Sequence, residues 1–256
     1  MNSPQEILEQ IVGMSQTLAQ PGWDCVILGE GNTSARVDEE SFYVKASGHQ
    51  LASAGTEGYV RVRFAPILEF LASSECADEA VTEVLTAAVL EPARLRPSIE
   101  TTLHAHLLSF EGVNFIGHTH PSALLILVGS QEGPALVRSG RITPEEVALL
   151  GPEPCWVPYS DPGVALGRAV RDAVAGYVDK WGCLPNQLLV ENHGLIVPGR
   201  TAQEVVTRTQ MAVKAARVLA GTMAFGGPRF LPPEEIERVM TRPDEAVRMR
   251  ALGWSV

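Results

Sequence analysis

Long hydrophobic runs are missing from this 256-residue sequence, although 45% of its residues are hydrophobic. The longest apolar run lies near residues 123–128 and falls far short of the about 20 residues that a membrane-spanning helix needs. Residues 1–20 also lack the basic-then-apolar pattern of a secretion signal. We therefore expect a cytoplasmic protein with no membrane partner.

Basic residues are scarce relative to acidic ones, with 20 Lys and Arg against 30 Asp and Glu and a formal net charge of -10. A surplus of negative charge repels nucleic acid and anionic lipid, so neither is a favoured partner. The four cysteines are also few and scattered, without a Cys-x-x-Cys pair. We expect them to be reduced thiols that are mostly buried.

Internal repeats and low-complexity linkers are absent, and the expected helices and strands are interleaved along the chain. This order favours a single layered α/β domain over residues 1–256, with 223–256 as a Pro- and charge-rich C-terminal tail. Apolar periodicity predicts helices over residues 4–19, 78–90, 122–128, 144–150, 163–180 and 201–221. Extended runs predict strands over residues 33–37, 41–45, 113–119, 156–157, 187–190 and 195–197. Another helix is expected to start at residues 97–100 with Ser98 as its N-cap, and the rest of residues 131–154 is expected to be loop.

Three of the six histidines occur where they could hold a metal ion. His118 and His120 stand at the end of a predicted strand, where residues two apart project to the same face. His193 lies in a tight turn between two short strands, and the neighbouring Gly194 permits close approach of backbone or ligand. Catalytic metal sites commonly have three protein ligands and one open position. These three histidines are therefore the candidate ligands.

Each of these signals has a plainer interpretation. A lone His-x-His on a strand is a weak indication of metal binding, and Asn-His-Gly is ordinary turn chemistry. Glu100 is either a carboxylate that stabilises a helix N-terminus or a general acid/base near the metal. His104, four residues further on, either supports that carboxylate or fills a polar core position. His49 and His106 receive no role.

Six short motifs follow one another along the chain. They are Gly31-Asn32-Thr33-Ser34, Lys45-Ala46-Ser47-Gly48, Pro97-Ser98-Ile99-Glu100, Gly117-His118-Thr119-His120-Pro121, Val157-Pro158-Tyr159 with Gly163, and Glu191-Asn192-His193-Gly194. In this arrangement, residues 5–222 resemble class II aldolases of the fuculose-phosphate aldolase, ribulose-phosphate epimerase and adducin type.

The resemblance implies a three-layer α/β/α sandwich around a central, mainly antiparallel sheet, often assembled as a four-fold symmetric tetramer. It implies Zn²⁺, or another divalent ion such as Mn²⁺, on His118, His120 and His193. It makes Glu100 the catalytic acid/base, where epimerases commonly have aspartate. The implied function is aldol cleavage or formation in a small sugar or sugar phosphate through an enediolate. A 4-epimerase, a related decarboxylase or dehydratase, and a non-catalytic adducin-like binding protein remain alternatives.

The resemblance also assigns a seat for the substrate's phosphate to Asn32, Ser47, Gly48 and Ser98. Relatives have a second serine where this chain has Ile99, whose side chain cannot donate a hydrogen bond. A phosphorylated substrate is therefore in doubt, with Lys45 as a possible replacement donor.

Two further expectations concern residues around the site. The ligand imidazoles need hydrogen-bond acceptors behind them, and Asn192 or Glu191 is a candidate. Relatives use a tyrosine as proton donor, but the tail over residues 230–256 contains none. Tyr159 is expected to pack the site rather than to react. The apolar tail around residues 230–232 and Trp254 is expected to pack on another subunit.

Overall fold

The protein contains a seven-stranded sheet with the strand order β3-β2-β1-β4-β7-β6-β5. A computed structural model describes residues 3–90 and 95–242. Five of the six strand pairings are antiparallel and only β5 and β6 run parallel. The strands are β1 Asn32–Arg36, β2 Ser41–Lys45, β3 Tyr59–Arg63, β4 Phe115–Thr119, β5 Cys155–Val157, β6 Leu188–Val190 and β7 Gly194–Gly199. The expected α/β fold with a mainly antiparallel sheet is thus confirmed.

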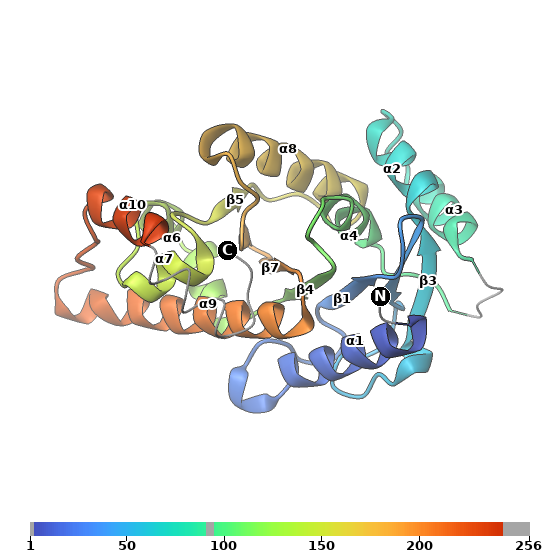
Figure 1. Ribbon diagram of the computed structural model, residues 1–256, viewed down its shortest axis with the longest axis horizontal. Helices are drawn as coiled ribbons and strands as arrows, with labels where there is room; N and C mark the ends of the chain where they lie inside the picture. Colours follow the sequence, from blue (N-terminus) through green and yellow to red (C-terminus); the bar gives the residue numbers. More distant parts are fainter. Residues whose placement is uncertain (1–2, 91–94, 243–256) are drawn as a thin grey trace.

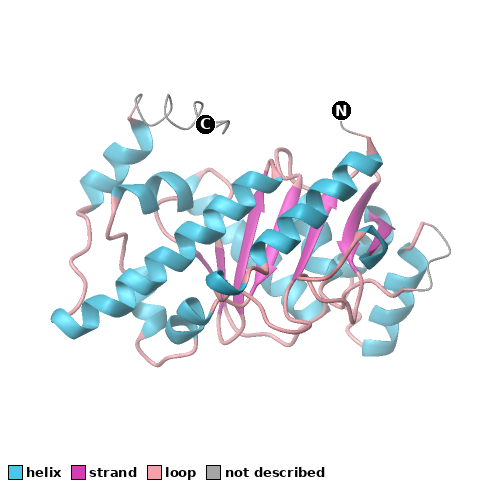
Figure 2. Ribbon diagram, turned by 90° about the horizontal axis from the view of Figure 1, so that it is seen from below, coloured by secondary structure: helices cyan, strands magenta, loops and turns pink. Residues whose placement is uncertain are grey.

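Helices cover both faces of this sheet. Figure 1 shows α8, α4 and α2 on one side of the strands and α9 and α1 on the other, and Figure 2 shows the α1 and α9 side. Adjacent residues of β4 point to opposite faces, so Ile116 packs in the core under α4 and α8, whereas Phe115 packs in the core under α1 and α9. The α-helices are α1 Pro4–Leu18, α2 Phe64–Ala72, α3 Asp78–Ala88, α4 Thr101–Leu108, α5 Ser122–Val128, α6 Gly133–Arg138, α7 Pro144–Leu150, α8 Val164–Trp181, α9 Ala202–Thr222 and α10 Pro233–Thr241. Short 3₁₀ turns occupy Pro21–Trp23, Thr56–Gly58 and Met223–Phe225.

The first helix, α1, forms where the sequence patterns predict it. Ser3 caps it, because its hydroxyl accepts from the Glu6 N–H while the Glu6 carboxylate accepts from the Ser3 N–H. Apolar residues at helical spacing, such as Ile11 and Leu18, are fully buried against the sheet. Helix α1 therefore matches the predicted range of residues 4–19 to within one residue.

Other elements differ from expectation. Sequence patterns predict neither β3 nor α2, and Pro66 in the first turn of α2 obscures its helical signal although proline is tolerated there. The Gly- and Pro-rich stretch 131–154 contains α6 as well as the expected α7. Strand β4 begins at Phe115 rather than at residue 113. Helix α4 begins at Thr101, so residues 97–100 precede it.

The described part of the C-terminal tail packs on its own chain, and its expected contact with another subunit stays a prediction. Phe230 lies against the core beneath α9, and its ring is close to Gly140. The Leu231 N–H donates to the Arg141 carbonyl at 2.8 Å, and α10 packs on α7. Trp254, also expected at a subunit contact, lies outside the described residues.

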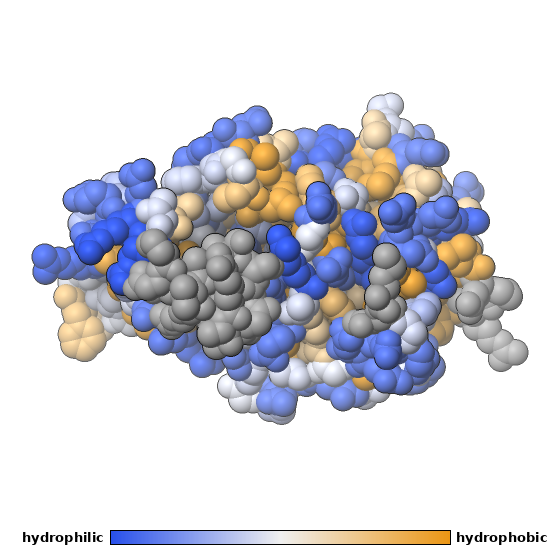
Figure 3. Space-filling model, in the orientation of Figure 1, coloured by the Kyte–Doolittle hydropathy of each residue, from blue (hydrophilic) through white to orange (hydrophobic). Residues whose placement is uncertain are grey.

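The surface agrees partly with the composition. Hydrophilic residues cover much of the face shown in Figure 3. All four cysteines are free, but only Cys25 and Cys155 are buried, so the expectation of mostly buried thiols is wrong for Cys76 and Cys183. Among the described residues, no helix is both long and apolar enough to cross a membrane.

Candidate metal centre

Two antiparallel pairings bring the three candidate histidines together. His118 lies on β4, between Asn32 of β1 and Ile196 of β7. His120 follows the end of β4 and projects to the same face as His118. His193 occupies the turn between β6 and β7, after Asn192, whose φ of 52° is left-handed. The centre therefore sits where the middle strands of the sheet end.

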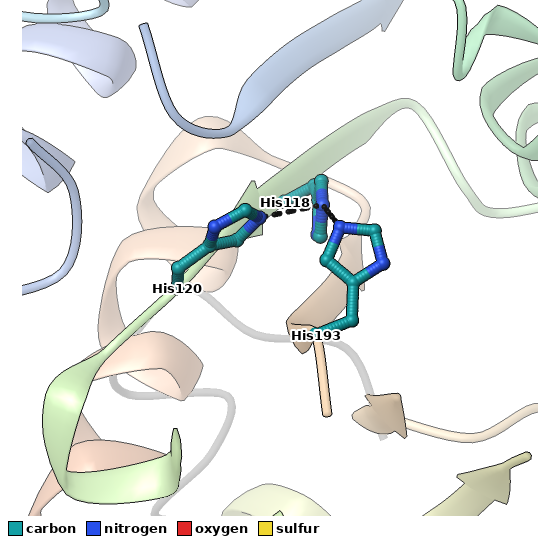
Figure 4. Close-up of side chains that lie close together, drawn as sticks. All are labelled: His118, His120 and His193. Atoms are coloured by element: carbon teal, nitrogen blue, oxygen red, sulfur yellow. Dashed lines mark hydrogen bonds between the residues drawn. The ribbon is translucent and has the colours of Figure 1, made fainter. Parts of the chain in front are cut away.

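The three imidazoles converge on one point. His118 Nε2 lies 3.3 Å from His193 Nε2 and 3.2 Å from His120 Nε2. Figure 4 shows the three rings directed toward one another. Three nitrogens at about 2.0–2.1 Å from one tetrahedral ion are separated by roughly 3.3 Å. The spacing of these nitrogens therefore fits a zinc-like ion, and the three side chains form a group that could hold a metal.

Hydrogen bonding fixes the form of the buried His118. Its Nδ1 lies 3.0 Å from the Leu195 carbonyl, which can only accept, so Nδ1 carries the proton. Burial lowers the pKa of His118, so the ring is neutral at neutral pH and Nε2 presents a lone pair to the centre. The predicted acceptors, Asn192 and Glu191, do not fill this role. Instead, the Glu191 carboxylate accepts from the Tyr159 N–H at 3.1 Å.

The second ligand is also held in its neutral form. Burial, with a smaller contribution from the neighbouring His118 ring, lowers the pKa of His120 to about 3. Only neutral imidazole binds metal, so this environment favours ligation at neutral pH. An unprotonated His118 Nε2 faces a carboxylate oxygen of Glu100 at 3.4 Å. Two lone-pair-bearing atoms at this separation repel unless a cation or proton lies near both, which is a further property of a metal site.

Two glycines allow the backbone to approach the ligands closely. A Cβ on Gly194 would lie 2.5 Å from the Thr119 carbonyl oxygen and 2.9 Å from His120 Cδ2. A Cβ on Gly31 would lie 2.5 Å from the His118 carbonyl oxygen, and the φ of Gly31 is +67°. Side chains at these positions would push the ligand-bearing segments apart. The close approach expected beside His193 is thus present.

Glu100 borders the same space. Its Oε1 lies 3.3 Å from His193 Nε2, and its Oε2 accepts a 2.6 Å hydrogen bond from Asn32 Nδ2. Burial alone would raise the pKa of this carboxyl, but positive charge placed at the His118 ring and the hydrogen bond from Asn32 lower it below its usual range. Glu100 occupies the position before α4, where its side chain caps no backbone group. The contacts of Glu100 therefore do not support a role as a simple helix-end charge.

The residues expected to seat a phosphate divide into two kinds. Ser47 and Gly48 are exposed on the loop after β2, whereas Asn32 and Ser98 are buried. A bridge between Ala46 and Pro97 brings the two segments side by side. The Ser98 hydroxyl accepts from Asn32 Nδ2 at 3.2 Å and from the Glu100 N–H at 3.3 Å. Ser98 is thus not the N-cap of α4.

The possible replacement donor, Lys45, is buried and already engaged. Its ammonium donates to the carbonyls of His49 at 2.6 Å and Ala46 at 3.3 Å. Burial lowers the pKa of Lys45, while the nearby Glu100 opposes that shift. The ammonium therefore stabilises its own loop through these two hydrogen bonds.

The tyrosines near this region do not point to a proton donor. Tyr159 is 54% exposed, and its hydroxyl donates to Asp161 at 3.0 Å. Tyr177 is buried on α8, with its hydroxyl 3.4 Å from the Glu153 carbonyl. Neither hydroxyl has a hydrogen bond to a candidate ligand or to Glu100 among the contacts of the described residues.

The chain matches one known protein family over most of its length. Residues 9–220 match the class II aldolase and adducin N-terminal domain, and the chain belongs to this family. A curated relative from Bacillus subtilis (strain 168), described as the uncharacterized oxidoreductase YuxG, is 26% identical over 223 residues. That match covers 82% of this chain but 30% of the relative, so the chain spans less than a third of that protein.

Solved structures share the fold. The N-terminal class II aldolase domain of a conserved protein from Thermoplasma acidophilum superposes with a TM-score of 0.66 at 25% identity, covering 86% of this chain and 96% of that one. An L-fuculose 1-phosphate aldolase superposes with a TM-score of 0.69 at 16% identity, covering 93% and 96% of the two chains. The second comparison is a likeness of fold alone.

Proposed function

We propose that this protein is a metal-dependent aldolase that cleaves or forms a carbon–carbon bond in a small sugar or sugar phosphate. The observation that carries the proposal is the placement of the Glu100 carboxylate, 3.3–3.4 Å from Nε2 of His193 and His118. A group able to transfer protons thus adjoins three converging imidazoles. This pairing suits chemistry in which a proton moves while negative charge develops on oxygen.

The chain's ligands suit a zinc ion, with Mn²⁺ as another candidate. When bound, such an ion supplies Lewis acidity that stabilises negative charge on a substrate oxygen. His118, His120 and His193 would hold it as neutral imidazoles, which leave its positive charge undiminished. The Leu195 carbonyl keeps His118 in the tautomer that ligation requires.

Glu100 is the proposed acid/base. Its carboxylate is buried and ionised, and Asn32 holds Oε2 by a 2.6 Å hydrogen bond. This contact leaves Oε1 toward His193 as the oxygen that can accept or return a proton. Proton transfer by a positioned carboxylate typically contributes about 10²–10⁴-fold to rate.

The substrate's far end is proposed to rest near Asn32, Ser47, Gly48 and Ser98. Ser47 and Gly48 are exposed there, so a ligand can reach them. A homotetramer, with small molecules rather than nucleic acid or membrane as its other partners, completes the proposal. An ionised carboxylate buried beside three imidazoles is costly to keep, which argues against a purely adducin-like binding role.

The decisive experiment combines elemental analysis of chelator-free protein with a screen for retro-aldol cleavage of free and phosphorylated ketoses. We expect about one divalent ion per chain and release of an aldehyde from at least one ketose. Inversion at C4 without net cleavage would favour a 4-epimerase, and loss of CO₂ or water would favour a decarboxylase or dehydratase. Absence of metal would overturn the proposal.

A pair of carboxylate variants separates catalysis from folding. Glu100→Gln should retain the metal and reduce turnover by roughly a hundredfold or more. Glu83→Gln, which removes an exposed carboxylate from α3, is the matched control and should keep both properties. Full turnover in Glu100→Gln would show that Glu100 transfers no proton.

A further inference from the structure

Behind Glu100 lies a row of buried polar side chains that the proposed chemistry does not yet use. Ser34 Oγ is 2.7 Å from His104 Nδ1, and His104 Nε2 is hydrogen-bonded to Asn32 Oδ1. Asn32 Nδ2 in turn donates to Glu100 Oε2 at 2.6 Å. Ser34 and His104 are fully buried, and Asn32 and Glu100 are 4% and 6% exposed. Competition from bulk water is therefore weak along the whole row.

The row has one chemically consistent direction. The Glu100 carboxylate can only accept, so the Asn32 NH₂ must face it and Asn32 Oδ1 must face His104. An oxygen there requires a proton on His104 Nε2. The neutral ring then accepts at Nδ1, and the Ser34 hydroxyl donates to it. Each group thus fixes the donor or acceptor role of the next.

Two elements of the fold, β1 and α4, supply Asn32, Ser34 and His104. Asn32 and Ser34 are two apart on β1, so their side chains project to the same face. His104 comes from α4 and reaches both of them, across 72 and 70 residues of sequence. Sequence spacing related His104 to Glu100, but the contact between them runs through Asn32.

We propose that His104 and Ser34 are positioning residues that orient the Asn32 amide, so that Asn32 holds one oxygen of Glu100 and leaves the other free to react. The inference rests on the proposed function and reassigns Asn32, which the family resemblance gives to the substrate's phosphate. A flipped amide would set its NH₂ against the His104 N–H and its oxygen against the carboxylate. Both contacts are repulsive, so His104 excludes the flipped state.

The first test reads the arrangement without using activity. In ¹⁵N-labelled, metal-loaded protein, long-range ¹H–¹⁵N NMR should show His104 protonated at Nε2, and one Asn32 side-chain proton should be shifted downfield by the carboxylate. Ser34→Ala should let both His104 tautomers appear. An Nδ1-protonated His104 in the wild-type protein would overturn the proposal.

The second test uses kinetics on whichever ketose is cleaved. His104→Leu should lower kcat on the order of tenfold or more, with KM and metal content little changed. His104→Gln, whose side-chain amide can still donate to Asn32, should recover part of the loss, and Ser34→Ala should show a smaller loss. Equal losses of kcat in His104→Leu and His104→Gln, with native thermal stability, would show that the row of polar side chains contributes only packing.

The two proposals can fail separately. If no substrate is turned over but the NMR pattern is found, the orientation of Asn32 by His104 is supported and only the aldolase assignment falls. If turnover is found and Ser34→Ala leaves both the His104 tautomer and kcat unchanged, the aldolase assignment stands and the positioning role falls. Ser34→Ala removes one oxygen and is the variant least prone to misfold.

Discussion

The candidate metal centre and the expected phosphate seat lie close together but are built differently. The candidate ligands His118 and His120 stand at the end of a strand paired on both sides, and His118 Nε2 lies 3.3 Å from His193 Nε2 and 3.2 Å from His120 Nε2. The seat residues Ser47 and Gly48 lie on an exposed loop. Sheet register fixes the first group, whereas the second lies outside the sheet and is exposed to solvent. If the proposed function is correct, we expect the sheet to determine the type of reaction and the exposed loop to determine which substrate binds.

Loss of one ligand is the harshest challenge to the strand-held centre. His118→Ala should reduce bound metal from about one ion per chain to near zero, because two imidazoles no longer complete a three-ligand site. Turnover should fall to background. Elemental analysis and retro-aldol assays check both results, with His49→Ala as a histidine control whose metal content should stay at the wild-type value. Full metal occupancy in His118→Ala would move the centre elsewhere.

A methyl group at the strand crossing tests how rigid the centre is. Gly194→Ala would place its Cβ 2.5 Å from the Thr119 carbonyl, so β4 and β7 must separate and His120 must shift. We expect a loss of about 1–3 kcal/mol in the free energy of unfolding and weaker metal binding. Denaturant titration measures the first and competition with a chelator the second.

The matched glycine control lies on a helix. A Cβ on Gly13 of α1 would meet nothing within 4 Å, so Gly13→Ala should stabilise the protein slightly through helix propensity. Equal behaviour of the two alanine variants would mean that the ligand-bearing strands tolerate displacement, and the contrast with the loop would disappear.

Much of this contrast was predictable, for identifiable reasons. Strand alternation alone put His118 and His120 on one face, and the motif order supplied His193 as their partner. The Leu195 carbonyl behind His118 left no signal, because any residue type offers a carbonyl and only the β4–β7 register places it. The role of Asn32 was hidden for a related reason. Its partners His104 and Glu100 are about 70 positions away in the sequence. Only the folded structure shows that they form hydrogen bonds with the two ends of its side-chain amide.

The pH dependence of the metal-free protein probes the buried histidines as a group. Burial, with a smaller contribution from the neighbouring His118 ring, lowers the pKa of His104 to about 3, and His120 has a similar value. In the unfolded chain both titrate near about 6.5. Below that pH the unfolded state binds more protons, so the free energy of unfolding should fall as pH drops from about 6.5 toward 3.

This dependence is measured by urea denaturation at several pH values. Its slope should be shallower in His104→Gln, because one of the histidines whose pKa is lowered by folding is gone. The same slope in the wild-type and the variant would show that His104 does not contribute, and that acid acts on other parts of the molecule.

The smallest expected effect concerns the loop side of the site. Ile99 is 49% exposed and lies beside Gly163, between Ser98 and Glu100, at the position where the family resemblance predicts a serine. Ile99→Ser should add one hydroxyl donor to the seat. A hydrogen bond to a charged group contributes about 1.5–3 kcal/mol, and partial exposure favours the lower value, which corresponds to about tenfold in affinity. Inorganic phosphate should therefore inhibit the variant about tenfold more strongly than the wild-type protein.

Ile126→Ser, at a 62% exposed apolar position on α5, is the control and should leave phosphate inhibition unchanged. If the wild-type protein already binds phosphate tightly and Ile99→Ser adds nothing, then the exposed Ser47–Gly48 loop supplies the missing donor. In that case the loop side of the site would be as well formed for its ligand as the strand side is for the metal.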